Sequence, residues 1–126
     1  RSQIEKTSRN TVILDAYNAN PTSMTLALQN LSAMEANQKF FVIGDMMELG
    51  SASQEEHQKI VQLADELSLP GILVGKEFGK VDQTKLEHFD SNAEAAEHLE
   101  SINLHDYLIL VKGSRGIKLE DVMPSL

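Results

Sequence analysis

Short apolar segments alternate along this sequence with longer segments whose apolar residues recur at helical spacing. The apolar segments span residues 11–14, 40–43, 72–74 and 107–111, and a weaker one lies around residues 86–89. The stronger segments are rich in valine, isoleucine and leucine, as in strands buried on both faces of a sheet. Strands that alternate with helices predict βαβ units, and therefore an α/β fold with a mainly parallel sheet covered on both faces.

The segments between these strands carry signals for the starts of helices. Asn20 is a preferred N-cap, and Pro21 suits the first helical position because no N–H is needed there. The residues that follow at helical spacing and form one apolar face are Met24, Ala27, Leu28, Leu31 and Met34. Capping boxes predict two further helices, at Ser51 with Gln54 and at Ser91 with Glu94, and a short helix is expected after residue 116.

Composition excludes several classes of protein. Lys+Arg 11 against Asp+Glu 19 gives a net charge of −8, which counts against a nucleic-acid-binding domain. No apolar run approaches the roughly 18 residues of a membrane span. The absence of cysteine excludes disulfides and thiolate metal sites, and it permits a cytoplasmic location.

The length of 126 residues, 41% of them hydrophobic, suits a single domain spanning residues 1–126. Residues 1–9 are expected to form a hinge or linker that leads into the first strand region. Arg1 does not follow an initiator methionine, so we expect the chain to be a fragment of a larger protein.

Polar segments follow three of the predicted strands, at 15–20, 44–50 and 112–115. In open α/β sheets, ligands bind beyond the carboxyl ends of the strands. We therefore expect these three segments to meet at one edge of the sheet and to form a binding site there.

The first polar segment suits a nucleoside. Asp15 can accept hydrogen bonds from a ribose diol, as acidic residues do in dinucleotide folds. Asn18 and Asn20 can pair with a base or a substrate amide. A structural interpretation is equally supported, in which Asn20 caps a helix, Asp15 holds the turn and Tyr17 packs.

The other two polar segments carry opposite charges. Asp45 and Glu48 can meet an ammonium group or contact Mg²⁺ through water, although a structural turn with solvated acids is the stronger interpretation. Lys112, Ser114 and Arg115 combine two cations with a hydroxyl, which suits a carboxylate or a phosphate.

The four histidines show no metal-ligand spacing, and no metal site is predicted. They are expected at the surface or half-buried: His57, His88, His98 and His105. No serine lies in a G-x-S-x-G motif, so a serine-hydrolase triad is not supported.

Three motifs together resemble one family. They read Asp15-Ala-Tyr-Asn-Ala-Asn-Pro-Thr-Ser-Met24, Gly44-Asp-Met-Met-Glu-Leu-Gly50 and Val111-Lys-Gly-Ser-Arg115. Their order and spacing resemble the C-terminal domain of the Mur ligases, above all the members that add D-alanyl-D-alanine to UDP-N-acetylmuramoyl-tripeptide. The resemblance covers nearly the whole chain and implies a Rossmann-like three-layer α/β/α sandwich.

The resemblance also implies an activity. Mur ligases are three-domain cytoplasmic enzymes of peptidoglycan synthesis that use ATP and Mg²⁺ to form an amide through an acyl phosphate. The C-terminal domain is the lid that binds the nucleoside and the incoming dipeptide. No G-x-x-x-x-G-K-[ST] motif occurs in this sequence, so the phosphate cradle and the main Mg²⁺ ligands are expected in an upstream central domain. The isolated domain is therefore expected to be inactive, without catalytic residues of its own.

Site residues follow from the resemblance position by position. Asp15 resembles the acid that bonds the ATP ribose, and Arg1 resembles a hinge arginine that contacts the nucleotide. Tyr17, Asn18 and Asn20 match a turn that touches adenosine or the peptide substrate. The resemblance places Lys112, Ser114 and Arg115 at the carboxylate of the dipeptide, and Asp45 and Glu48 near its amine.

Alternatives remain open at this point. A sister Mur ligase or an enzyme similar to folylpolyglutamate synthase shares the domain. A receiver-like phosphoacceptor module is the rival from another class, because Asp15, Asp45 and Lys112 all follow predicted strands. Paired acids after the first strand are missing, and Gly113 follows Lys112 where a receiver has proline. A non-catalytic Rossmann-like interaction domain has only composition in its favour.

Overall fold

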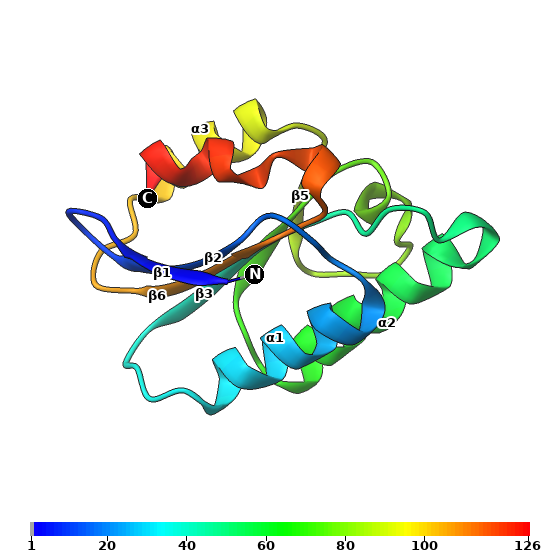
Figure 1. Cartoon of the computed structure of the whole chain (residues 1–126), viewed down its shortest axis with the longest axis horizontal. Coiled ribbons are helices and arrows are strands. Elements are labelled where there is room, and N and C mark those ends of the chain that lie inside the picture. The colour runs from blue at the N-terminus through cyan, green and yellow to red at the C-terminus, as the bar shows by residue number, and fades with distance from the viewer. Residues whose placement is uncertain (1) are drawn as a thin grey trace.

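The computed structural model describes residues 2–126, which form one mixed sheet between two helical layers (Figure 1). The strands are β1 (Gln3–Lys6), β2 (Thr11–Asp15), β3 (Lys39–Gly44), β4 (Gly71–Val74), β5 (Glu87–Phe89) and β6 (Leu108–Lys112). Their order in the sheet is β1-β2-β6-β3-β4-β5. Every neighbouring pair is parallel except β1 and β2. The predicted α/β sandwich with a mainly parallel sheet is confirmed.

Helices cover both faces of the sheet (Figure 1). On one face lie α1 (Pro21–Ala33) and α2 (Ser53–Glu66). The other face carries α3 (Asn92–Ile102) and the 3₁₀ helix η4 (Leu119–Ser125). Three short 3₁₀ helices complete the described chain: η1 (Gly50–Ala52), η2 (Phe78–Lys80) and η3 (Arg115–Ile117).

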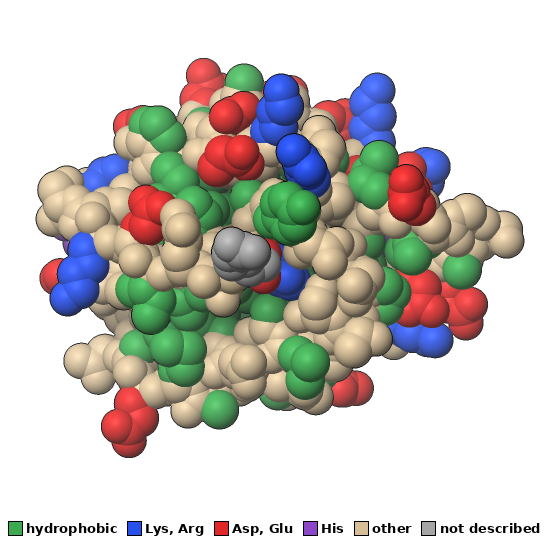
Figure 2. All heavy atoms as spheres, in the orientation of Figure 1, with side chains coloured by type: hydrophobic (Ala, Val, Ile, Leu, Met, Phe, Trp, Pro, Cys, Tyr) green, Lys and Arg blue, Asp and Glu red, His purple; other side chains and the backbone are tan. Residues whose placement is uncertain are grey.

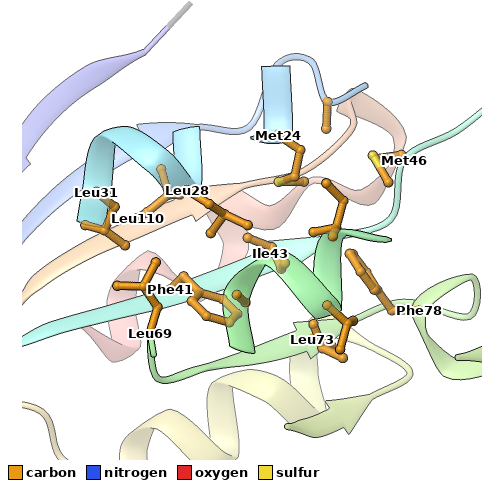
Figure 3. Close-up of a cluster of buried hydrophobic side chains, with 14 residues drawn as sticks. Met24, Leu28, Leu31, Phe41, Ile43, Met46, Leu69, Leu73, Phe78 and Leu110 are labelled. Carbon is orange, nitrogen blue, oxygen red and sulfur yellow. The ribbon is translucent and has the colours of Figure 1, made fainter. Parts of the chain in front are cut away.

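The larger packed cluster lies between the sheet and α1 with α2. Figure 3 shows Phe41, Ile43 and Leu73 pointing from their strands toward the helices. Met24, Leu28 and Leu31 of α1 are almost fully buried against them, as the helical spacing predicts. Met34 ends this stripe as the C-cap and is 37% exposed, because the chain leaves the helix there. Complete burial of such aliphatic side chains stabilises the fold by about 1.5–3 kcal/mol each.

Two of the predicted helix caps are present and one is not. The Asn20 side chain accepts a hydrogen bond from the Ser23 N–H, and the Ser91 side chain accepts one from Glu94 N–H. The capping box predicted at Ser51 is wrong. Residues 50–52 form the 3₁₀ turn η1 instead, so α2 begins at Ser53 without a side-chain cap. The segment after residue 116 is also 3₁₀ rather than α-helical, and it contains Pro124.

Asn10 fastens the end of the sheet opposite the predicted site. Asn10 is 5% exposed, and its Nδ2 donates to the carbonyls of Leu104 and Leu126 at 2.9 Å each. Its Oδ1 accepts from the Tyr107 N–H at 2.9 Å. One side chain thus joins the β1–β2 turn, the loop before β6 and the last residue of the chain.

Candidate functional site

The three polar segments meet at the carboxyl edge of the sheet. β2, β6 and β3 are adjacent and parallel, so their last residues lie side by side. The Gly113 N–H donates to the Asp15 carbonyl at 3.3 Å, and the Ser114 N–H donates to the Asp45 carbonyl at 3.1 Å. The predicted meeting of residues 15–20, 44–50 and 112–115 is therefore present in the structure.

Lys112 is directed into this edge rather than out of it. Only 2% of the residue is exposed, and its Nζ lies 2.6 Å from Asp15 Oδ2 and 2.9 Å from the Asn18 carbonyl. A buried ammonium needs such partners, because desolvation without them is very costly. In this conformation Lys112 holds the residue 15–18 turn and does not present its charge to solvent.

Arg115 and Tyr17 form the exposed part of the site. The Arg115 Cζ lies 5.3 Å from the centre of the Tyr17 ring, within range of a cation–π contact. Both side chains line a cavity of about 550 Å³ whose other lining residues are Gln3, Leu14, Ala16 and Glu120. This cavity therefore combines an aromatic face, apolar side chains and a guanidinium, whereas Asp15 and Lys112 line a different cavity, against α1.

The two asparagines of the first segment act locally. Asn20 is committed to the capping box with Ser23, and Asn18 offers its carbonyl to Lys112. Both residues are exposed, so they lie at the rim of the site.

Ser114 is the buried hydroxyl of the third segment. The residue is 7% exposed, and its Oγ has no hydrogen-bond partner among residues 2–126. The preceding Gly113 packs against the β3 end, where a Cβ would lie 3.3 Å from Gly44 Cα. This close approach places the Ser114 backbone against Asp45.

Asp45 differs from the solvated acid expected from the sequence. It is 3% exposed, and its two oxygens accept hydrogen bonds from the N–H groups of Glu77 and Phe78 at 3.0 and 2.9 Å. Burial raises the pKa of the Asp45 carboxyl above its ordinary value, and these backbone hydrogen bonds offset part of the rise. Its carboxylate stabilises the start of η2.

Glu48 is exposed and adopts a positive φ of 63° in the same loop. It is the acid of this segment that solvent reaches. The loop ends at Gly50, whose φ of 57° leads into η1.

His57 was expected at the surface or half-buried, and that prediction is wrong. It is fully buried on α2, where its Nε2 accepts from the Met46 N–H at 3.0 Å. His88 and His98 are half-buried and His105 is exposed, as expected. The position of His57 at helical spacing with Ile60, Val61 and Ala64, all on the buried face of α2, is the signal in the sequence for its burial.

The remaining predicted residue, Arg1, lies outside the described residues.

Across residues 2–126, no group of three or more His, Cys, Asp or Glu side chains is arranged to hold a metal ion. Within that same range, no helix is both long enough and apolar enough to cross a membrane. Figure 2 shows hydrophobic side chains gathered between the sheet and α1. Leu26 and Met34 are both exposed and line one cavity beside α1.

Comparison with known proteins identifies the family. A family model described as "Mur ligase, glutamate ligase domain" matches residues 1–115. The chain belongs to the Mur ligase family. The resemblance of the three motifs and the predicted fold are both confirmed by this match.

Individual Mur ligases cover nearly the whole chain. UDP-N-acetylmuramoyl-tripeptide–D-alanyl-D-alanine ligase of Rickettsia prowazekii is 31% identical over 98% of this chain, which spans 29% of that enzyme. The enzyme of the same name from Bacillus subtilis is 32% identical over 91% of this chain and 27% of its own length. A crystal structure of MurF from Acinetobacter baumannii superposes with a TM-score of 0.83 at 33% identity, covering 98% of this chain and 29% of that one. The chain thus spans less than a third of these relatives.

The receiver-like alternative is excluded by topology as well as by family. A receiver has the parallel order 2-1-3-4-5. Here the last strand, β6, lies between β2 and β3, and an antiparallel β1 forms the edge.

Proposed function

We propose that this chain is the lid domain of an ATP-dependent ligase that adds D-alanyl-D-alanine to UDP-N-acetylmuramoyl-tripeptide in cytoplasmic peptidoglycan synthesis. The observation that carries the proposal is the meeting of three family motifs at one sheet edge, through the Asp15–Lys112 and Asp45–Ser114 contacts. Five relatives with the dipeptide-adding name match 89–98% of this chain.

Asp15 and Tyr17 would bind the nucleoside of ATP. A carboxylate has about four lone-pair positions, so Asp15 can accept from ribose hydroxyls while Lys112 orients it. The Tyr17 ring, 60% exposed, offers an aromatic face to the base. Asn18 and Asn20 lie beside them on the rim, and Arg1 would contact the nucleotide from the start of the chain.

Ser114 and Arg115 would bind the incoming dipeptide. The Arg115 guanidinium can pair with the terminal carboxylate in the bidentate manner that arginine favours. The buried Ser114 hydroxyl lacks a partner among the residues described and can donate to the same ligand. Glu48 is the exposed acid that suits the dipeptide amine, whereas Lys112 and Asp45 would support these residues from behind.

Mg²⁺ would be held mainly by the central domain of the enzyme, in keeping with the lack of a cluster of three or more His, Asp or Glu side chains arranged for a metal among residues 2–126. ATP supplies the phosphoryl group that activates the acceptor carboxylate. The residues of this chain would bind, orient and exclude water from the reactants. Because it has no P-loop, the isolated domain should not catalyse the ligation.

Steady-state kinetics of the full-length protein test this division of roles. Asp15→Ala should raise the KM for ATP more than that for D-alanyl-D-alanine, and Arg115→Ala should do the reverse. Asp106→Asn and Lys85→Ala change exposed charges away from the rim and serve as controls. Equal effects of both variants on both substrates would contradict the proposal.

A sister ligase that adds a different residue is the second candidate, because it would share this fold and nucleoside site. Supplying the full-length protein with D-alanyl-D-alanine or with single amino acids distinguishes the two. Preference for a single amino acid would favour the sister ligase.

A further inference from the structure

His57 is held in one neutral tautomer by two backbone groups. Its Nε2 lies 3.0 Å from the Met46 N–H, and its Nδ1 lies 2.7 Å from the Ser53 carbonyl. An N–H can only donate and a carbonyl can only accept. The ring therefore carries its proton on Nδ1 and a lone pair on Nε2, so it links the start of α2 to the loop after β3.

Met46 is the point at which this loop is fastened. Its side chain is 1% exposed and lies at one end of the large apolar cluster, near Phe78 (Figure 3). The Phe78 ring packs edge-on against the His57 ring, with centroids 4.5 Å apart. The imidazole thus satisfies a backbone N–H that is buried among apolar side chains and out of reach of water.

Met46 lies within two residues of groups that belong to the proposed dipeptide site. Asp45, next to Met46, accepts the Ser114 N–H on its carbonyl at 3.1 Å. Glu48, two residues beyond Met46, reaches solvent at a positive φ. Displacement of Met46 would therefore move the support of Ser114 on one side and Glu48 on the other.

We propose that His57 is a positioning residue for the dipeptide end of the site, acting through the Met46 N–H. The assignment rests on the function proposed above. His57 is fully buried, and each ring nitrogen is already engaged with the backbone, so it does not touch substrate itself. Of the proposed site it contacts the loop of residues 44–50, through Met46, while the residue 15–18 turn is held separately by Lys112.

Substitutions in the full-length protein separate this role from simple packing. His57→Leu keeps an apolar body but removes the acceptor, whereas His57→Gln can still offer an oxygen to Met46. His57→Leu should raise the KM for D-alanyl-D-alanine roughly tenfold and leave the KM for ATP within about twofold. His57→Gln should lie closer to wild type. His105→Leu, at an exposed histidine, is the matched control and should change neither constant.

Amide hydrogen exchange at Met46 provides a readout that needs no substrate. His57→Leu should speed this exchange at least about tenfold relative to wild type and to His105→Leu. Unchanged exchange, or faster exchange with both KM values unchanged, would overturn the role of His57. Failure of the wild-type protein to join the dipeptide would instead overturn the proposed function.

If His57→Leu does not fold, the tautomer of His57 in the wild-type protein tests the proposal instead. A long-range ¹H–¹⁵N spectrum at neutral pH should show His57 protonated on Nδ1 and bare on Nε2. Protonation on Nε2 would rule out acceptance from Met46 and overturn the proposal.

Discussion

The ammonium of Lys112 and the carboxylate of Asp15 lie 2.6 Å apart at the ends of two adjacent parallel strands. Both side chains are largely withdrawn from water, with 3% and 15% exposed. Removal of Asp15 leaves the buried Lys112 ammonium without this carboxylate. We expect Asp15→Asn to lower the free energy of unfolding by about 3 kcal/mol, measured by urea denaturation. Asp106→Asn, at an exposed aspartate, should have little effect, and equal midpoints for the two variants would contradict this account.

Gly75 packs directly over the Asp45 carboxylate. Its φ is 117°, and a Cβ there would lie 2.3 Å from Asp45 Cγ. Gly75→Ala should therefore destabilise the protein by more than about 2 kcal/mol, through both backbone strain and displacement of Asp45. Gly116→Ala is the matched control, because no atom lies within 4 Å of its added Cβ. Thermal unfolding of the two variants gives the comparison, and a wild-type Tm for Gly75→Ala would refute it.

Asn10 satisfies three backbone groups from segments far apart in the sequence. Asn10→Ala leaves these groups buried without that partner, so we expect a loss of about 3 kcal/mol in the free energy of unfolding. Asn37→Ala, at an exposed asparagine, should cost less than about 0.5 kcal/mol. Chemical denaturation measures both. A small loss for Asn10→Ala would mean that water replaces the side chain.

Glu77 should make stability depend on acid pH. The Ser53 hydroxyl and then the Lys80 ammonium donate to its carboxylate, and they lower the pKa of Glu77 below its ordinary 4.5. The ionised carboxylate therefore stabilises the fold above about pH 4.5, and this contribution is lost as the pH falls through the lower folded pKa. Glu77→Gln should cost about 0.5–1 kcal/mol at pH 7, and this cost should shrink progressively as the pH falls below 4.5.

The Asp45 carboxyl titrates in the opposite sense, because burial raises its pKa above 3.8. Its protonation adds stability as the pH falls. The charge of Glu77 is the smallest of the causes that act on the Asp45 pKa, so the difference between wild type and Glu77→Gln reports mainly on Glu77 itself. Glu35→Gln, at an exposed acid, is the control. A difference that does not shrink on acidification would contradict the prediction.

Local signals in the sequence predicted most of the fold. Apolar runs marked the central strands, and Asn20 with Pro21 marked the start of α1. The common direction of parallel strands then predicted which three loops would meet. These features depend on neighbours in sequence or on general topology, so they can be read without coordinates.

Long-range contacts explain what the sequence did not reveal. Asp45 is buried because the N–H groups of residues 77 and 78, some thirty positions away, need an acceptor. His57 is buried because Met46 needs one too. Lys112 turns inward because Asp15 lies beside it in the sheet. Each of these polar residues looks like a surface residue from the sequence alone. In the structure each is buried because it forms a hydrogen bond or an ion pair with a group from a distant part of the sequence.

β1 runs antiparallel to β2, so Gln3 pairs with Leu14, immediately before Asp15. Gln3 therefore lies at the same edge of the sheet as Asp15, while the β1–β2 turn near Asn10 lies at the opposite edge. If the Asp15 edge binds the nucleoside as proposed, a rotation of the domain about Gln3 would move Asp15 over a shorter path than Asn10. The nucleoside would then stay close to its carboxylate while the opposite edge of the sheet moved.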